Sequence, residues 1–297
     1  MNFAELLRTL KLKVSRNTDD AAQKAAINWA IREIASEDTS WEWLQIKDYP
    51  ITTVGIYSTG TITLTQASRS VVLATGTWPS TAGNLGTKLK ISGDSSFYEV
   101  RKRVSNSEIE LKYPYGLATA AGQGYQLFQD AYIAPTDMKR GNYIRDPNGT
   151  YEPLPYMEDI DMDRAYFTSF NSGDPWAFNT DTKGLVRIYP APEDARTLML
   201  TYFRNHPPLV NNDDRALMDD DFHNAIITGA MIFLADTYET TFEKSKLQKE
   251  YDRMIEKLKS NNKPPAGTVI TRRSPYSGRL DDYYGEEYPR TWPGTIT

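Results

Sequence analysis

The 297-residue sequence contains no cysteine and only two histidines. The absence of cysteine excludes disulfide bonds, thiolate nucleophiles and thiolate metal sites. The histidines, His206 and His223, lie 17 positions apart, and no third histidine accompanies them. We expect both to be structural, with no cofactor and no metal. A two-histidine metal site completed by carboxylates stays open as an alternative.

Long apolar runs are also missing. The longest charge-free apolar stretch is AIITGAMIFLA, 11 residues from Ala225 to Ala235, which is too short to span a bilayer. The first residues, MNFAELLRTLKLKVSR, are amphipathic and lack the uncharged core of a signal peptide. We therefore expect a chain that is neither exported nor placed in a membrane. A formal net charge of −5 makes it a poor candidate for gripping nucleic-acid phosphates.

Catalytic signatures are absent as well. The sequence has no phosphate-binding G-x-x-x-x-G-K-[ST] and no G-x-S-x-G. Two acidic clusters, MEDIDMD at 157–163 and DDRALMDDDF at 213–222, are explained by a solvated face and by helix capping. On a strand, Asp159, Asp161 and Asp163 would share one face, so an enzyme that uses them with a cation is kept as an alternative. We expect no catalytic residue and no enzyme.

The residues near both ends of the sequence show the apolar spacing of helices. In the first 46 residues, an apolar stripe at i, i+3, i+4 and i+7 predicts a helix, and Asn17 or Thr18 is expected to cap a second one. That second helix has two apolar faces and so needs two neighbours. A further helix is predicted to start at Asp219–Asp221 and is apolar nearly all round, which indicates burial here or against another copy. An amphipathic helix follows it. Residues 1–50 and 219–260 are thus expected to form a helical bundle.

Between these helices the period changes to two. Residues 51–135 hold short alternating segments separated by Gly, Ser, Asn and Pro, which predict a small β-barrel or sandwich-like insertion. The strands expected in it are 61–66, 70–75, 87–92, 97–105, 108–112 and 125–134. Trp78 is expected to anchor a loop in this insertion. The module's aromatic residues also allow a carbohydrate-binding module as an alternative function. These aromatics are Trp78, Tyr98, Tyr113 and Tyr115.

Residues 136–218 are mixed and rich in proline. Within them, residues 184–204 read GLVRIYPAPEDARTLMLTYFR, two alternating segments joined by a turn. We predict a projecting β-hairpin, stiffened because Pro190 and Pro192 fix φ and remove two donors. The alternative is that this P-A-P stretch merely ends one strand and starts another. Glu193 and Asp194 at the turn complete this candidate interface.

Composition changes again after Ser260. Residues 261–297 contain five Pro and four Gly, and their aliphatic residues are too scattered to bury a core. The segment is either a solvated tail or an extended arm that docks on a partner, and its aromatic and arginine residues favour the arm. The candidate contact residues are Arg272, Arg273, Tyr276, Arg279, Tyr283, Tyr284, Tyr288 and Trp292.

The order of these pieces carries a resemblance. An N-terminal helix with INWAIREIA is followed by WEWL, and later come SGDPWAF (172–178), the P-A-P segment and a helix starting DDDFHNAIITGA. Read in this order, roughly residues 15 to 260 resemble the head-to-tail adaptor proteins of tailed bacteriophages, chiefly those with short tails. The fold class expected is α+β: a helical bundle with a small β-barrel-like insertion, a projecting hairpin and an extended C-terminal arm.

The resemblance implies a structural virion protein of the phage neck, assembled in the bacterial host cytoplasm. It implies a homo-oligomeric ring, commonly of twelve copies, that joins the portal protein to a tail nozzle or tube protein. DNA would pass through the lumen without specific binding. The arm would reach the portal or a neighbouring copy, and the hairpin would face the tail. Another tail component (nozzle, stopper or tube) is the alternative. Residues expected to pack between subunits are Trp29, Ile31, Trp41, Trp43 and Phe233.

Overall fold

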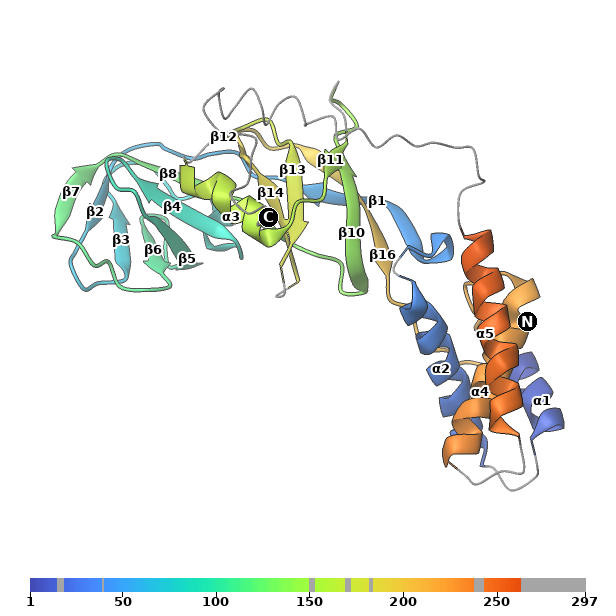
Figure 1. Cartoon of the computed structure of the whole chain (residues 1–297). Helices are drawn as coiled ribbons and strands as arrows, with labels where there is room; N and C mark the ends of the chain where they lie inside the picture. The colour runs from blue at the N-terminus through green and yellow to red at the C-terminus, as the bar shows by residue number, and fades with distance from the viewer. Residues whose placement is uncertain are drawn as a thin grey trace, which may run out of the picture. The chain divides into compact units, whose positions relative to one another are not determined.

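The computed structural model describes residues 1–14, 19–38, 40–149, 153–168, 172–181, 184–237 and 243–262. It is a mixed α and β structure (Figure 1). Residues Met1–Ile255 form one compact unit, and Glu256–Thr297 form a second, of which the described part continues a helix. The arm residues predicted from the sequence all lie outside the described residues.

The helices near both ends of the first unit pack together. They are α1 (Phe3–Lys13), α2 (Asp20–Glu37) and α4 (His223–Thr237), and α1, α2 and α4 are in mutual contact (Figure 1). The start of α1 is a capping box, in which the Asn2 side chain accepts from Glu5 N–H and the Glu5 carboxylate accepts from Asn2 N–H, both at 2.9 Å. The predicted cap of α2 was misplaced. Its N-cap is Asp19, and Asn17 and Thr18 fall outside the described residues.

Gly229 explains how three helices meet. A Cβ built on Gly229 of α4 would lie 3.1 Å from Ala30 of α2 and 3.1 Å from the ring of Tyr251, which belongs to α5 (Lys244–Asn261). Those distances are tighter than ordinary van der Waals contact. The apolar sequence of α4 is therefore used on two sides within this chain.

A seven-stranded antiparallel sheet occupies most of the predicted insertion. Its order is β7-β2-β3-β6-β5-β4-β8. The sheet curls, because Tyr57, which precedes β2, is bridged to Leu127 of the edge strand β8. Trp78 is fully buried in its core, as predicted for a loop anchor. The strands are β2 (Ile62–Leu64), β3 (Ser70–Leu73), β4 (Thr87–Ile91), β5 (Phe97–Arg103), β6 (Glu108–Leu111), β7 (Ala120–Gln123) and β8 (Tyr125–Gln129).

Two further sheets share a second core. A four-stranded sheet has the order β1-β16-β10-β11, and a three-stranded sheet has the order β13-β14-β9. Their common core is built around residues such as Ile144, Phe178 and Leu200. A short parallel pair, β12 with β15, forms a separate two-stranded sheet. The strands are β1 (Gln45–Thr52), β9 (Ala131–Ile133), β10 (Met138–Arg145), β11 (Leu154–Pro155), β12 (Ser172–Gly173), β13 (Ala177–Thr180), β14 (Leu185–Tyr189), β15 (Ala191–Pro192) and β16 (Thr197–Arg204).

The predicted projecting hairpin at 184–204 is wrong. β14 pairs with β13 and β9, whereas β16 pairs with β1 and β10, so the two strands belong to different sheets. Pro190 and Pro192 are buried between them, which is the place the alternative interpretation assigned to this stretch. Their missing donors are tolerated because the chain leaves one sheet here and enters another.

Two strand boundaries also differ from expectation. Residues 45–52 form β1 rather than the end of a helical region, and the pairing of β1 with β16 shifts register between Ile46 and Tyr49. Asp48 there has a φ of 63°, so the bulge interrupts the period of two that would have revealed the strand. The strand expected at 125–134 divides at Asp130 into β8 and β9, which lie in different sheets.

Candidate interaction surfaces

The segment around Glu193 and Asp194 is held rigidly by the chain at 53–56. Ile56 N–H donates to Glu193 O (3.1 Å), and the buried Thr53 hydroxyl contacts Asp194 O (3.1 Å) and accepts from Arg196 N–H (2.9 Å). A Cβ on Gly55 would lie only 2.8 Å from Glu193 O, so this close approach requires glycine. Glu193 and Asp194 are themselves exposed. Two fixed carboxylates therefore remain at the surface, although no hairpin projects.

A side-chain hydrogen bond and two ion pairs also stabilise the segment around Glu193 and Asp194. The Ser172 hydroxyl donates to the Glu193 carboxylate (2.8 Å), and Arg196 lies 2.9 Å from Asp174 and 3.5 Å from Asp146. The Tyr189–Pro190 peptide bond is cis. Of the four residues expected at this interface, the two prolines are internal and the two acids are accessible.

The five residues expected to pack between subunits also divide into buried and partly exposed side chains. Ile31 and Trp41 are 2% and 1% exposed, so this chain already covers them. Trp29 of α2 and Phe233 of α4 are only half-buried, and their rings lie 5.2 Å apart. Trp43 is half-buried too, between Trp41 at 5.8 Å and His206 at 6.1 Å. The Trp29–Phe233 pair is therefore the part of this set that presents aromatic surface on the helices.

Both histidines have structural contacts. His206 Nε2 accepts from Leu217 N–H at 3.1 Å, so Nδ1 carries the proton and donates to Pro207 O at 2.6 Å. Burial lowers the pKa of His206 and also that of His223, which opens α4 beside Asp220. Within the described residues, no group of three or more His, Cys, Asp or Glu is placed to hold a metal.

The acids at 159, 161 and 163 do not all share one face. They lie on α3 (Asp159–Thr168), where a spacing of two residues rotates the side chain by about 200° around the helix axis, so Asp161 points away from Asp159 and Asp163. Asp159 accepts from the buried Asn179 amide, Asp161 lies 3.4 Å from Arg164, and Asp163 lies 3.3 Å from Arg187. The expectation of one carboxylate row rested on a strand and is wrong.

Most of the four aromatic residues that suggested carbohydrate binding are at least partly buried. Trp78 and Tyr115 are buried in the core, at 0% and 5% exposure. Tyr98 is half-buried, and burial together with its hydrogen bond to Asp94 raises its pKa. Tyr113 alone among the four is strongly exposed. The set weighed for carbohydrate binding is thus mostly internal.

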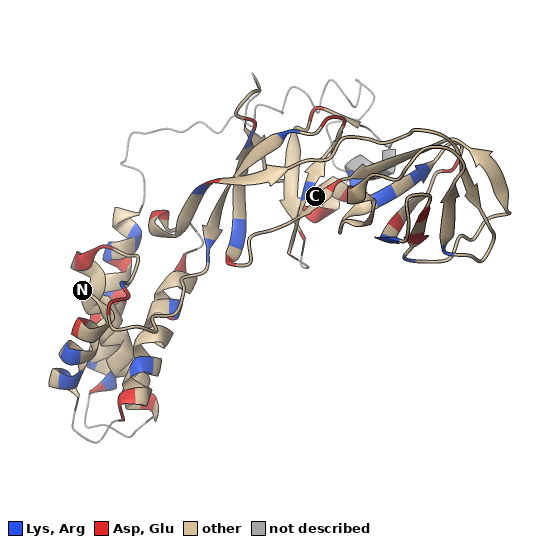
Figure 2. Ribbon diagram, turned by 180° about the vertical axis from the view of Figure 1, so that it is seen from behind, with Lys and Arg blue, Asp and Glu red and all other residues tan. Residues whose placement is uncertain are grey.

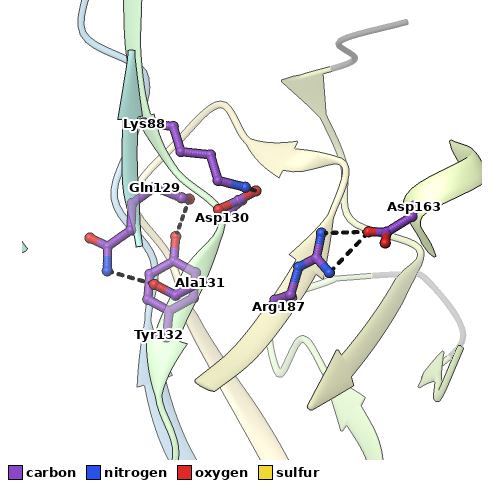
Figure 3. A network of polar contacts seen from close by, with 7 residues as sticks. All are labelled: Lys88, Gln129, Asp130, Ala131, Tyr132, Asp163 and Arg187. Carbon is purple, nitrogen blue, oxygen red and sulfur yellow. Dashed lines mark hydrogen bonds and ion pairs between the residues drawn. The ribbon is translucent and has the colours of Figure 1, made fainter. Parts of the chain in front are cut away.

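A polar network joins the seven-stranded sheet to the three-stranded sheet (Figure 3). Lys88 of β4 donates to the fully buried Asp130 at 2.6 Å, and Ile188 N–H of β14 donates to Asp130 O at 2.8 Å. The Gln129 amide donates to Ala131 O at 3.0 Å, and Tyr132 O–H donates to Gln129 O at 2.8 Å. The segment in which the chain passes from one sheet to the other is thereby held by an ion pair and by hydrogen bonds.

Charges are spread over the described elements in both signs (Figure 2). Residues 56–129 carry seven Lys or Arg against four Asp or Glu, a net +3, so the rest of the chain carries 27 against 35, a net −8. In the described part of the chain, no helix is both long enough and apolar enough to cross a membrane. Residues 261–297 carry five Lys or Arg against four Asp or Glu, so the acidic excess belongs to the rest of the chain outside residues 56–129.

The described residues thus present half-exposed aromatic rings and exposed acids whose backbone is held by hydrogen bonds. The sequence model of the SU10 adaptor protein family matches residues 97–275, more than half of the chain. The chain belongs to this family and is a phage structural adaptor. No curated protein matches it. The match supports the resemblance over the later strands, α4 and α5, and it begins inside the seven-stranded sheet.

Proposed function

We propose that this protein is a non-enzymatic virion component that forms a ring between the portal vertex of a phage head and the tail, and that continues the DNA channel. Membership of an adaptor family supports a place between head and tail proteins. The ring would be homo-oligomeric, commonly of twelve copies, with the portal on one side and a nozzle or tube protein on the other. It would reside in the virion neck after assembly in the host cytoplasm.

The observation that carries the ring is the Trp29–Phe233 pair. Aromatic side chains contribute most to binding when they become fully buried in an interface. In α2 and α4 the neighbouring apolar residues, such as Ile31 and Leu234, are covered within the chain, while this pair keeps exposed ring surface. A cyclic assembly would cover it, because each copy then contacts its neighbours through two different faces. These helices would form the subunit bundle around which the ring is built.

The remaining parts of the proposal follow from charge and position. An acidic channel would repel the phosphates of DNA and let the DNA slide. The exposed Glu193 and Asp194 would either line this channel or contact the tail protein. The arm at 261–297 would dock on the portal or on a neighbouring copy. Direct binding of the ring to the portal protein would separate the adaptor from the alternative of a nozzle, stopper or tube protein.

The test is the native mass of the purified chain across concentration, for the full chain, for a version ending at Ser260, and for Phe233→Glu. We expect a closed ring from the full chain, a smaller assembly without the arm, and a monomer from Phe233→Glu. Leu12→Glu is the control, because Leu12 on α1 is 82% exposed and outside the pair. A full chain that stays monomeric at all concentrations, or a Phe233→Glu variant that still forms the ring, would contradict the proposal.

A further inference from the structure

One end of the seven-stranded sheet is a rigid, exposed surface built from two loops. We call it the tip: residues 66–69 between β2 and β3, and residues 112–119 between β6 and β7. Tyr115 anchors it, because its ring is 5% exposed in the sheet core, its N–H donates to Ser68 O and its O accepts from Ala67 N–H, both at 2.8 Å. Gln66 N–H also donates to the Thr119 hydroxyl at 3.0 Å.

The tip presents apolar and basic side chains and no acid. Tyr113 is 68% and Leu117 is 52% exposed, although both belong to a loop fixed by its own core residue. Arg69 is exposed, with no acidic partner among the described residues, and the Lys112 ammonium lies over the Tyr113 ring at 5.5 Å. A loop whose backbone is already fixed loses little backbone entropy on binding, and exposed Tyr and Arg side chains are typical of binding hot spots.

The start of α3 presents the complementary chemistry. Ile160 is 60% exposed and Tyr156 just before the helix is 37% exposed. Residues 156–164 carry four acids against one arginine, a net −3, although Asp163 is paired with Arg187 outside this segment. The tip carries a net +2, of which the Lys112 charge is paired with Glu99 outside the tip, so Arg69 is its unpaired cation among the described residues. Met162 is fully buried and Asp159 binds the buried Asn179, so this helix is held in place while Ile160 faces solvent. Both the tip and the α3 surface therefore combine an exposed apolar side chain with charged groups, and the net charge is positive on the tip and negative on the α3 surface.

We propose that the tip of one copy docks on the α3 surface of a second copy of this chain, with Leu117 and Tyr113 against Ile160 and Arg69 facing the acids Glu158 and Asp161. Charge complementarity between two different regions of the same chain selects a second copy as the occupant. Because the two surfaces differ, the contact is heterologous and repeats from copy to copy. This contact rests on the proposed ring and adds a second site to it, distinct from the Trp29–Phe233 pair.

The absence of native cysteine permits a specific cross-linking test. The full chain carrying Leu117→Cys and Ile160→Cys is treated with a short bismaleimide and run on a denaturing gel. The matched control carries Val104→Cys and Ile160→Cys, since Val104 lies in another turn of the same sheet and is 50% exposed, close to the 52% of Leu117. We expect a ladder of covalent multimers from the first variant and only monomer from the control.

A charge-reversal series completes the design. Arg69→Glu in the Leu117→Cys/Ile160→Cys background should abolish the ladder, and Glu158→Lys added to it should restore most of it. Equal ladders from test and control variants, or a ladder indifferent to Arg69→Glu, overturn the docking. A ring seen by native mass without a ladder overturns the docking and leaves the proposed function standing. A chain that stays monomeric and yields no ladder overturns both.

Discussion

At the scale of single residues, a comparison of two glycines separates the stability cost of an unfavourable backbone conformation from the cost of a steric clash. Gly86 and Gly93 both have a φ of +83°, but a Cβ on Gly86 would lie 2.2 Å from Ala131 O, whereas one on Gly93 meets nothing within 4 Å. Gly93→Ala is expected to cost about 1–2 kcal/mol, the left-handed penalty alone. Gly86→Ala should cost roughly 3–5 kcal/mol, because the clash is with backbone and adds to the same penalty.

Urea unfolding of the two alanine variants measures this difference. Since the conformational penalty is shared, subtracting one free energy of unfolding from the other isolates the contact between the β4 entry and Ala131. Equal losses in the two variants would mean that the chain relaxes around Ala131, and that the close approach is not a constraint.

A second residue-scale prediction concerns pH. Burial lowers the pKa of His206 below its ordinary 6.5, so the unfolded chain binds a proton first as pH falls. Stability is then full above about pH 6.5 and declines below it, by roughly 1.4 kcal/mol per pH unit for each such histidine until the folded pKa is reached. His223, whose pKa is also lowered, acts in the same direction.

His206→Asn should therefore flatten the dependence of unfolding free energy on pH just below about pH 6.5, with the remaining slope due to His223. Carboxylates such as Asp94 and Asp214 do not interfere, because their pKa values lie below 3.8 when folded and they act at lower pH. An unchanged slope in His206→Asn would remove His206 as a source of acid sensitivity.

Single-residue roles were the easiest to predict from sequence. Burial of Phe3, Leu6, Leu7 and Leu10 follows from their spacing. Gly86 could not be found this way, because its requirement comes from Ala131, which is 45 positions away. Nothing in the local sequence distinguishes it from Gly93.

At the scale of elements, α2 shows how a helix end is fixed by distant parts of the chain. Ala35 O accepts from the Lys139 ammonium of β10 at 2.8 Å, and Ile34 O accepts from the Trp41 indole N–H at 3.0 Å. No basic residue lies in the last turn of α2 itself. A cation from a strand thus supplies the charge that a helix C-terminus favours.

Lys139→Met should lower the free energy of unfolding by about 1 kcal/mol, because a partly buried carbonyl loses a charged donor. Lys47→Met is the matched control: Lys47 is exposed on β1, and its replacement should change stability by less than about 0.5 kcal/mol. Equal effects from both substitutions, measured by urea unfolding, would show that Lys139 does not cap the helix.

Element types were predicted better than element partners. Alternation located β3, β4 and β6 within a residue or two, yet the same alternation at 184–204 suggested a hairpin that does not exist. The true partners of β16 are residues 45–52 and 138–145. A period of two identifies a strand but carries no information about which distant strand pairs with it.

At the scale of the whole molecule, the buried Lys88–Asp130 pair links two sheets. Lys88 belongs to the seven-stranded sheet, and Asp130 O also accepts from Ile188 N–H of the three-stranded sheet. Breaking a buried pair by removing one member leaves a charge in a poorly solvated place, at a cost of about 3 kcal/mol. The sequence pattern that predicts the insertion gives no sign of this contact, because Lys88 and Asp130 are 42 positions apart.

Lys88→Met is therefore expected to lower the free energy of unfolding by about 3 kcal/mol, and Asp130→Asn in the same background to recover part of the loss, since the amide leaves no buried charge. Lys112→Met is the control, because Lys112 pairs with Glu99 at the surface and such a pair contributes less than about 1 kcal/mol. Hydrogen exchange at the Ile188 amide should accelerate in Lys88→Met and stay unchanged in Lys112→Met. If both variants unfold at the same urea concentration, the buried pair does not hold the two sheets together, and the hydrogen bonds of Gln129 and Tyr132 must do so.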